Sequence, residues 1–399
     1  MRLKLTLVAV ALIILLGGCA LSGFDRSLKL ITKPYRFSIL RWELTTLFSS
    51  SGEEKAQGGS VVEEYFALVE EIESLKSKLR EVKSGGEDGE LALLKLKIER
   101  LRERREALAP GVESVLSRQI KEVLAKEGIF NPFECYLRLK VNFPPVKFRL
   151  DKPPKLLVIS PRERIESLRE ILLKQDLSLK EMEEIEERAD KLGVSSLVVD
   201  LGGLAATYPS FVSAESSLKH VIETAVEEWV HQYLAFTPLG FSYLLDLSGL
   251  RRNYEVATIN ETVASMISKE IRAIICKEYY PQCQEEEEER VEEEFDFNRE
   301  MREIRKKVDE YLLKGEVRKA ERFMEWKREY LVSKGYYIRK LNQAYFAFHG
   351  TYADRPTSIS PIGGELKQLR EQSASLRDFL HTVSRITSRK ELSSSLTRD

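Results

Sequence analysis

The clearest hydrophobic pattern in the chain covers residues 62–108, where apolar side chains recur at alternating steps of three and four. One series ends near Val82, a glycine-containing segment at 84–89 interrupts it, and a second series begins at Leu91. This heptad spacing predicts two helices with facing apolar seams, joined as an antiparallel coiled-coil hairpin. The seam residues are Tyr65, Leu68, Ile72, Leu75, Leu79 and Val82, followed by Leu91, Leu94, Ile98, Leu101 and Leu108.

The sequence predicts where the hairpin ends and leaves two alternatives for its function. Pro110 and Gly111 are expected to end its second arm, and a separate amphipathic helix is expected at about 112–127. We expect the seam residues to be used mostly within the hairpin. The arm is then either a solvated structural spacer or a docking surface for a helical protein partner.

The pattern changes after residue 133 to a mixture of α and β. Short apolar runs at 156–159 and 196–199, bounded by Pro or Gly, predict strands, and charged stretches at 162–174 and 178–192 predict helices. After Pro209 the chain reads as helical almost to its end, with a helix or helix pair over 299–342 broken near Gly335. The predicted fold class is therefore mainly α with a small β-sheet (α+β).

The N-terminus has the pattern of an export signal. Arg2 and Lys4 precede an apolar run from Leu5 to Leu16 that is too short to span a hydrocarbon core of roughly 30 Å. The following Gly17-Gly18-Cys19 resembles a lipobox, which implies acylation of Cys19 and attachment to the outward-facing side of the cell membrane. Ordinary secretion and a short uncleaved anchor are the alternatives.

Composition narrows the possible partners. Lys and Arg total 63 against 64 Asp and Glu, so a formal net charge of −1 offers no general attraction for nucleic acid. The mature chain would retain Cys135, Cys276 and Cys283, which is too few for a disulfide-built scaffold. Cys276 and Cys283 either pair or remain buried free thiols, and the sequence leaves both open.

The candidate chemistry lies on a helix predicted between Ser216 and Pro238. Glu227 and His231 are four residues apart, so both reach one cation from one helix face, while Glu228 projects about 100° away and can hold a water beside it. His220 lies two turns or more before them, too far to share the ion, and is expected to be a surface or supporting residue. The motif resembles the HExxH helix of zincin metallopeptidases, with Glu227 in the first histidine's place.

A second motif strengthens this resemblance. Asn260 and Glu261 open a helix with Ala264 one turn on, and this is similar to the helix that supplies a glutamate as third ligand in gluzincins. Residues 201–209 resemble the edge segment against which an extended peptide lies, and residues 340–352 resemble the C-terminal helix of predicted bacterial lipoprotein aminopeptidases. The resemblance covers about residues 130–382.

The resemblance implies a membrane-tethered metallopeptidase acting on peptide or protein substrates. Glu227, His231 and Glu261 would hold the metal, and Glu228 would be the general base. Tyr345 would stabilise the oxyanion, with His349 and Tyr352 as further candidates of suitable residue type. Zinc is the expected metal, and the carboxylate-rich set also suits manganese, iron or cobalt.

The predicted organisation leaves a second function open. A zincin-like envelope lipoprotein without catalysis would act as a structural or protein-binding module, and a chance match of the motifs is the remaining alternative. The expected units are a signal peptide at 1–18, a linker at 19–61, the hairpin at 62–128, a zincin-like domain at 129–382 and a disordered tail at 383–399.

Overall fold

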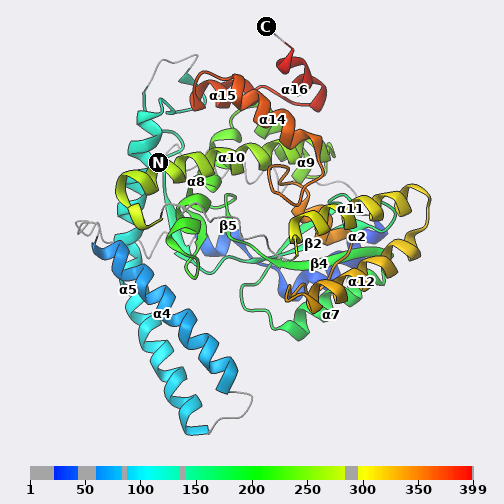
Figure 1. Cartoon of the computed structure of the whole chain (residues 1–399), viewed down its shortest axis with the longest axis horizontal. Helices are drawn as coiled ribbons and strands as arrows, with labels where there is room; N and C mark the ends of the chain where they lie inside the picture. The colour runs from blue at the N-terminus through cyan, green and yellow to red at the C-terminus, as the bar shows by residue number, and fades with distance from the viewer. Residues whose placement is uncertain (1–21, 44–59, 83–87, 135–139, 284–294, 398–399) are drawn as a thin grey trace.

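The computed structural model describes residues 22–43, 60–82, 88–134, 140–283 and 295–397. It is mainly helical with two small sheets of three strands each, which confirms the predicted fold class (Figure 1). Within these ranges no helix combines the length and apolarity needed to cross a membrane. The predicted export segment, Cys19 and Cys135 lie outside the described residues.

The predicted hairpin is present. Helices α4 (Ser60–Val82) and α5 (Asp88–Lys126) pack along each other, and their far ends project from the rest of the molecule (Figure 1). Near the tip the seam residues form a small cluster of their own, made of Ile72, Leu75 and Ile98 with Leu79, Leu94 and Leu101. The apolar seam of the distal half is therefore used within the hairpin, as the heptad pattern predicted, and Lys76 pairs with Glu215 of the body over 3.1 Å.

The proximal half of the hairpin corrects two expectations. Tyr65 and Phe66 belong to the main hydrophobic core, and the Tyr65 hydroxyl donates to the carbonyl of Ala214 over 3.2 Å. Pro110 does not end the helix, because α5 runs through it. Buried side chains on both sides of the proline, Ala109 and Val112, keep the helix on the core and outweigh the local cost of the proline ring.

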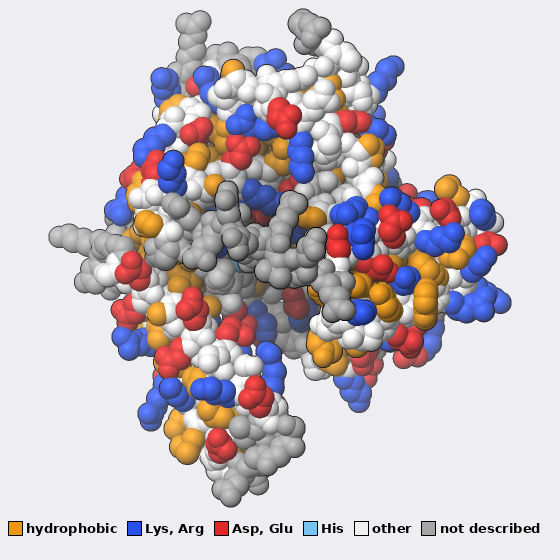
Figure 2. Space-filling view, viewed as in Figure 1, with side chains coloured by type: hydrophobic (Ala, Val, Ile, Leu, Met, Phe, Trp, Pro, Cys, Tyr) orange, Lys and Arg blue, Asp and Glu red, His pale blue; other side chains and the backbone are white. Residues whose placement is uncertain are grey.

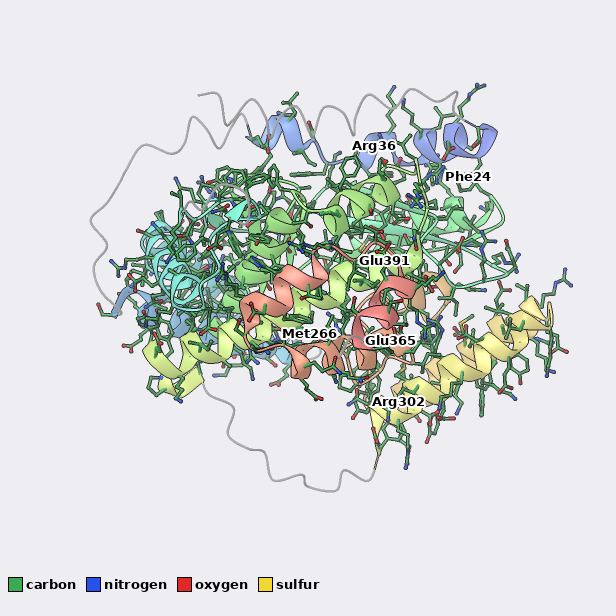
Figure 3. The ribbon with its side chains drawn as sticks, turned by 90° about the horizontal axis from the view of Figure 1, so that it is seen from above. Phe24, Arg36, Met266, Arg302, Glu365 and Glu391 are labelled. Carbon is green, nitrogen blue, oxygen red and sulfur yellow. A yellow bond between two sulfur atoms is a disulfide. The ribbon has the colours of Figure 1, made fainter. Side chains whose placement is uncertain are left out.

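The main core surrounds two long helices. α8 (Leu218–Leu234) packs on α10 (Tyr254–Tyr279), and α9 (Pro238–Leu247) connects them. Their buried faces carry large apolar side chains, including Trp229, Tyr233, Ile259, Val263 and Ile267. Figure 3 shows the C-terminal helices, with Glu365 and Glu391, lying against α10, which carries Met266.

One sheet has β2 (Lys155–Pro161) at its centre, antiparallel to both β3 (Arg169–Leu173) and β4 (Val194–Asp200). Helices α2 (Gly23–Thr32) and α7 (Leu179–Asp190) supply side chains to one face, and α13 (Gln343–His349) packs on the other. The strands at 156–159 and 196–199 and the helix at 178–192 are thus confirmed. The helix over 162–174 is wrong, because residues 169–173 pair with β2 as a strand.

The second sheet lies nearer to α8. β6 (Ser210–Ser213) is its central strand, parallel to β1 (Phe148–Asp151) and antiparallel to the short β5 (Gly203–Leu204). β5 pairs only with β6 within this sheet, so it is an edge strand. Two residues of the predicted edge segment 201–209 therefore lie in an edge strand.

Two expected unstructured segments are helical. The predicted linker contains α2, whose Leu28 and Ile31 are buried, followed by the short 3₁₀ helix η1 (Lys33–Tyr35). The predicted tail contains α16 (Arg389–Leu396), whose Leu392 is fully buried; α16 packs on α14 (Pro361–Gln372), which also contacts α15 (Leu376–Val383). A few well-spaced apolar residues are enough to order each segment, because the core offers them a surface.

The remaining elements are a helical pair and a disulfide. α11 (Phe297–Leu313) and α12 (Val317–Ser333) are separated at Gly315, whose φ of +72° reverses the chain, rather than only near Gly335. Figure 2 shows basic, acidic and apolar side chains interspersed over this face of the molecule. Cys276 is bonded to Cys283, which lies in the 3₁₀ helix η2 (Pro281–Cys283), so the paired alternative holds.

Candidate metal centre

The contact between α8 and α10 brings together the three residues that the sequence proposed as metal ligands. Glu227, His231 and Glu261 each offer one ligand atom, and these atoms all lie within 4.8 Å of one another. Glu227 and His231 are one turn apart on α8, whose opposite side is buried through Val226, Trp229 and Val230. Packing of the apolar side chains of α8 against the core therefore determines the direction in which Glu227 and His231 point.

His231 is held in a defined orientation. Its Nδ1 lies 2.8 Å from the side-chain oxygen of Asn260 on α10. Because an amide oxygen only accepts hydrogen bonds, Nδ1 donates to Asn260, and Nε2 is the ring nitrogen left to face Glu261. Nε2 is 3.6 Å from Glu261 Oε2, and the two side chains are each 13 % exposed.

Glu261 is held in a similar way. The Tyr243 hydroxyl on α9 donates to Glu261 Oε1 over 2.5 Å, which leaves Oε2 facing His231. Partners of this kind, which hold a ligand without touching the ion, are common around protein-bound metals. The spacing also fits an ion, since donors about 2.1 Å from a tetrahedral zinc lie about 3.4 Å from one another.

The carboxyl groups near His231 are buried close to one another, which disfavours their ionised forms. Burial raises the pKa of Glu227 to about 7, His231 opposes that rise, and Glu261 adds to it. Burial also raises the pKa of Glu228 well above its usual value, with further contributions from Glu227 and Glu261. Three carboxyl groups around one histidine are costly to ionise together, and a divalent cation would remove that cost.

Glu228 faces the edge strand β5 rather than the three ligand residues. Its carboxylate accepts a hydrogen bond from the backbone N–H of Ala205. It also lies so close to Gly203 that a β-carbon at that position would collide with it and with Thr224. Glycine is therefore required for β5 to approach α8 so closely.

A loop after α13 brings a tyrosine toward the ligand residues. The Thr262 hydroxyl, next to Glu261, donates to Thr351 O over 3.1 Å and accepts from the N–H of Ala353 over 2.9 Å. Between these contacts lies Tyr352, whose pKa is raised well above its usual value by burial and then by Glu261, Glu227 and Glu228. Tyr352 therefore keeps its O–H proton and can donate a hydrogen bond.

The other two candidate donors sit together on α13. The ring of Tyr345 is 4.3 Å from that of His349, and Tyr345 also packs against the β2–β4 side of the core. Burial raises the pKa of Tyr345, and burial together with Arg355 lowers the pKa of His349 to about 4. His349 is therefore neutral near pH 7. His220 is exposed at the start of α8, with its Nδ1 2.9 Å from Ser217 Oγ, as expected for a surface residue.

Four residues of this centre were not identified from the sequence as contributors. Tyr243 and Thr262 act through contacts between separate elements, so no local pattern indicates them. Gly203 stood in the predicted edge segment, but its contact with Glu228 depends on how two elements pack. Arg355 lies after the loop that carries Tyr352 and has no motif of its own.

Comparison with known proteins does not assign the chain to a family. No family model, no curated protein and no solved structure matches the chain.

Proposed function

We propose that the chain is a metal-dependent peptidase whose metal is held by Glu227, His231 and Glu261. The supporting observation is the convergence of three ligand atoms within 4.8 Å, with Glu228 turned toward the edge strand beside them. The side chains around them are arranged for this use, because Asn260 and Tyr243 each leave a ligand atom free.

A divalent cation bound there supplies a Lewis acid that polarises a carbonyl and makes water a stronger nucleophile at neutral pH. Two carboxylates and one imidazole suit zinc, and they also suit manganese and iron, since oxygen ligands weaken the preference for zinc.

The residues of the chain carry the proton and position the substrate. With a cation bound, Glu228 would be ionised, so it would take a proton from the attacking water and pass that proton to the leaving amine. The peptide would lie extended along β5, which is the last strand of its sheet within the described residues. Tyr352 donates to the oxyanion, and Tyr345 or His349 are the alternatives from α13.

The test is peptide hydrolysis by the Glu228→Gln variant. The amide cannot take a proton, so hydrolysis of a mixed peptide library, followed by mass spectrometry, should fall by about 10²–10⁴-fold. Bound metal should remain, because the three ligands are unchanged. Glu255→Gln, an exposed carboxylate on α10, is the control and should retain full activity.

The outcomes separate the two functions. Equal hydrolysis by Glu228→Gln and the parent would refute the assigned base. Bound metal without hydrolysis by the parent would instead support the alternative of a noncatalytic binding module, for which the distal arm with its exposed Leu93 and Leu96 offers a contact surface.

We also propose that Cys19 anchors the protein to the outward-facing side of the cell membrane through lipid. Replacing Cys19 by Ser should shift the protein from the membrane fraction to the soluble or unprocessed fraction, because the apolar run alone is a weak anchor. Unchanged fractionation, with no labelled lipid on the parent, would exclude the anchor.

A further inference from the structure

Arg355 ends the loop that is fixed to α10 beside the ligand Glu261. The two hydrogen bonds of Thr262 hold residues 351 and 353, and the N–H of Arg355 donates to the carbonyl of Tyr352 over 3.3 Å. The backbone of Arg355 is therefore tied to α10 through hydrogen bonds made within the four residues before it.

The guanidinium of Arg355 lies over the ring of the candidate donor Tyr352. Its central carbon is 4.1 Å from the centre of the Tyr352 ring, a cation–π contact that fixes the side chain while leaving its N–H groups available. The side chain is exposed to solvent, and within the described part of the chain it forms no ion pair. This contrasts with Arg162, Arg339, Arg370 and Arg389, each of which holds a glutamate in a paired geometry.

The electrostatic effects agree with this placement. Arg355 lowers the pKa of Glu227 and also that of Tyr352, each against a larger rise caused by burial. One positive charge therefore acts on the candidate metal centre from the side of the loop. A bound divalent cation would itself offset the charges of Glu227 and Glu261, so Arg355 would not be needed for that purpose.

We propose that Arg355 binds a carboxylate of the substrate, so that the site prefers peptides with an acidic group close to the scissile bond. This inference rests on the proposed function. A planar guanidinium matches a carboxylate through two parallel hydrogen bonds, and a fixed one loses little conformational freedom on binding. The carboxylate comes either from the C-terminus of a short peptide or from an aspartate or glutamate side chain.

Equilibrium binding tests the inference without relying on hydrolysis. The full chain with Glu228→Gln, supplemented with zinc, is titrated in a calorimeter with N-acetyl trialanine and with its C-terminal carboxamide. A second pair, N-acetyl-Ala-Ala-Glu carboxamide and its Gln counterpart, separates the side chain from the terminus as the source. We expect an acid to bind about tenfold more tightly than its neutral partner in at least one pair.

Variants of Arg355 identify the group responsible. Arg355→Gln should remove the preference for the acid while changing the affinity for the neutral peptide by less than about twofold. Arg355→Lys should retain part of the preference, because it keeps the charge and loses the paired geometry. Arg318→Gln, an exposed arginine on α12, is the matched control and should behave like the parent. Thermal unfolding of each variant shows whether the fold is intact.

The inference is overturned if neither pair shows a preference, if no peptide binds, or if the preference survives in Arg355→Gln. It is separable from the proposed function. A preference that depends on Arg355, in a protein that hydrolyses nothing, contradicts only the peptidase assignment. Hydrolysis that depends on Glu228 but treats acid and neutral peptides alike contradicts only the role of Arg355.

Discussion

Replacing Tyr243 by phenylalanine tests whether the hydroxyl that holds Glu261 contributes to metal binding. The ring stays in place, and the change removes one hydrogen bond of 2.5 Å to Glu261 Oε1. Hydrogen bonds to charged groups contribute about 1.5–3 kcal/mol, and loss of a partner that orients a ligand weakens metal binding by about 10–100-fold. Since 1.4 kcal/mol corresponds to tenfold, we expect zinc affinity to fall at least about tenfold.

The assay is competition for zinc against a chromogenic chelator at pH 7.5, with parent and variant side by side. Tyr254→Phe is the matched control, because its hydroxyl donates to the backbone carbonyl of Ala347 over 3.2 Å. It should bind zinc like the parent. Unchanged affinity in Tyr243→Phe, or an equal loss in both variants, would refute the role given to Tyr243.

Three further predictions concern the base, the arm and pH. Gly203→Ala should displace the Glu228 carboxylate, so hydrolysis should fall by about 10²-fold or more with metal content unchanged; equal loss of both would show general misfolding instead. Deleting residues 72–101 with a short Gly-Ser join should lower the free energy of unfolding of the body by less than about 1 kcal/mol, the size of a surface ion pair such as Lys76–Glu215, whereas Tyr65→Ala should lower it by about 3–5 kcal/mol in urea titrations. Metal-free protein should lose stability as pH rises from 4.5 to 7, because the pKa of Glu227 is raised in the folded state and its neutral form is favoured there. Thermal unfolding across this window should show the loss, Glu227→Gln should reduce it, and zinc should reverse it.

Local patterns allowed part of this fold to be predicted. The distal hairpin, the strands 156–159 and 196–199 and the helix carrying Glu227 and His231 follow from spacing along one element, where each residue's neighbours are known from the sequence. Glu227 and His231 lie near Glu261 because the two helices that carry these motifs, α8 and α10, pack together.

The remaining features depend on contacts between distant segments. Pro110 reads as a helix end, but buried neighbours keep α5 continuous through it. Residues 19–61 and 383–399 read as linker and tail, yet Leu28 and Leu392 are buried against other elements. Tyr345, His349 and Tyr352 were candidate donors by residue type, but the contacts by which Thr262 holds the loop around Tyr352 join segments about ninety residues apart in sequence.

The central claim is that Glu227, His231 and Glu261 form a metal site, and metal content tests it most directly. The parent, His231→Ala and the surface control His220→Ala are stripped with a chelator, reloaded with zinc, dialysed and analysed by mass spectrometry of the metal. We expect about one zinc per chain in the parent and in His220→Ala, and little in His231→Ala, because His231 supplies one of the three ligand atoms and the only nitrogen among them. A parent that retains no more zinc than His231→Ala would contradict the claim.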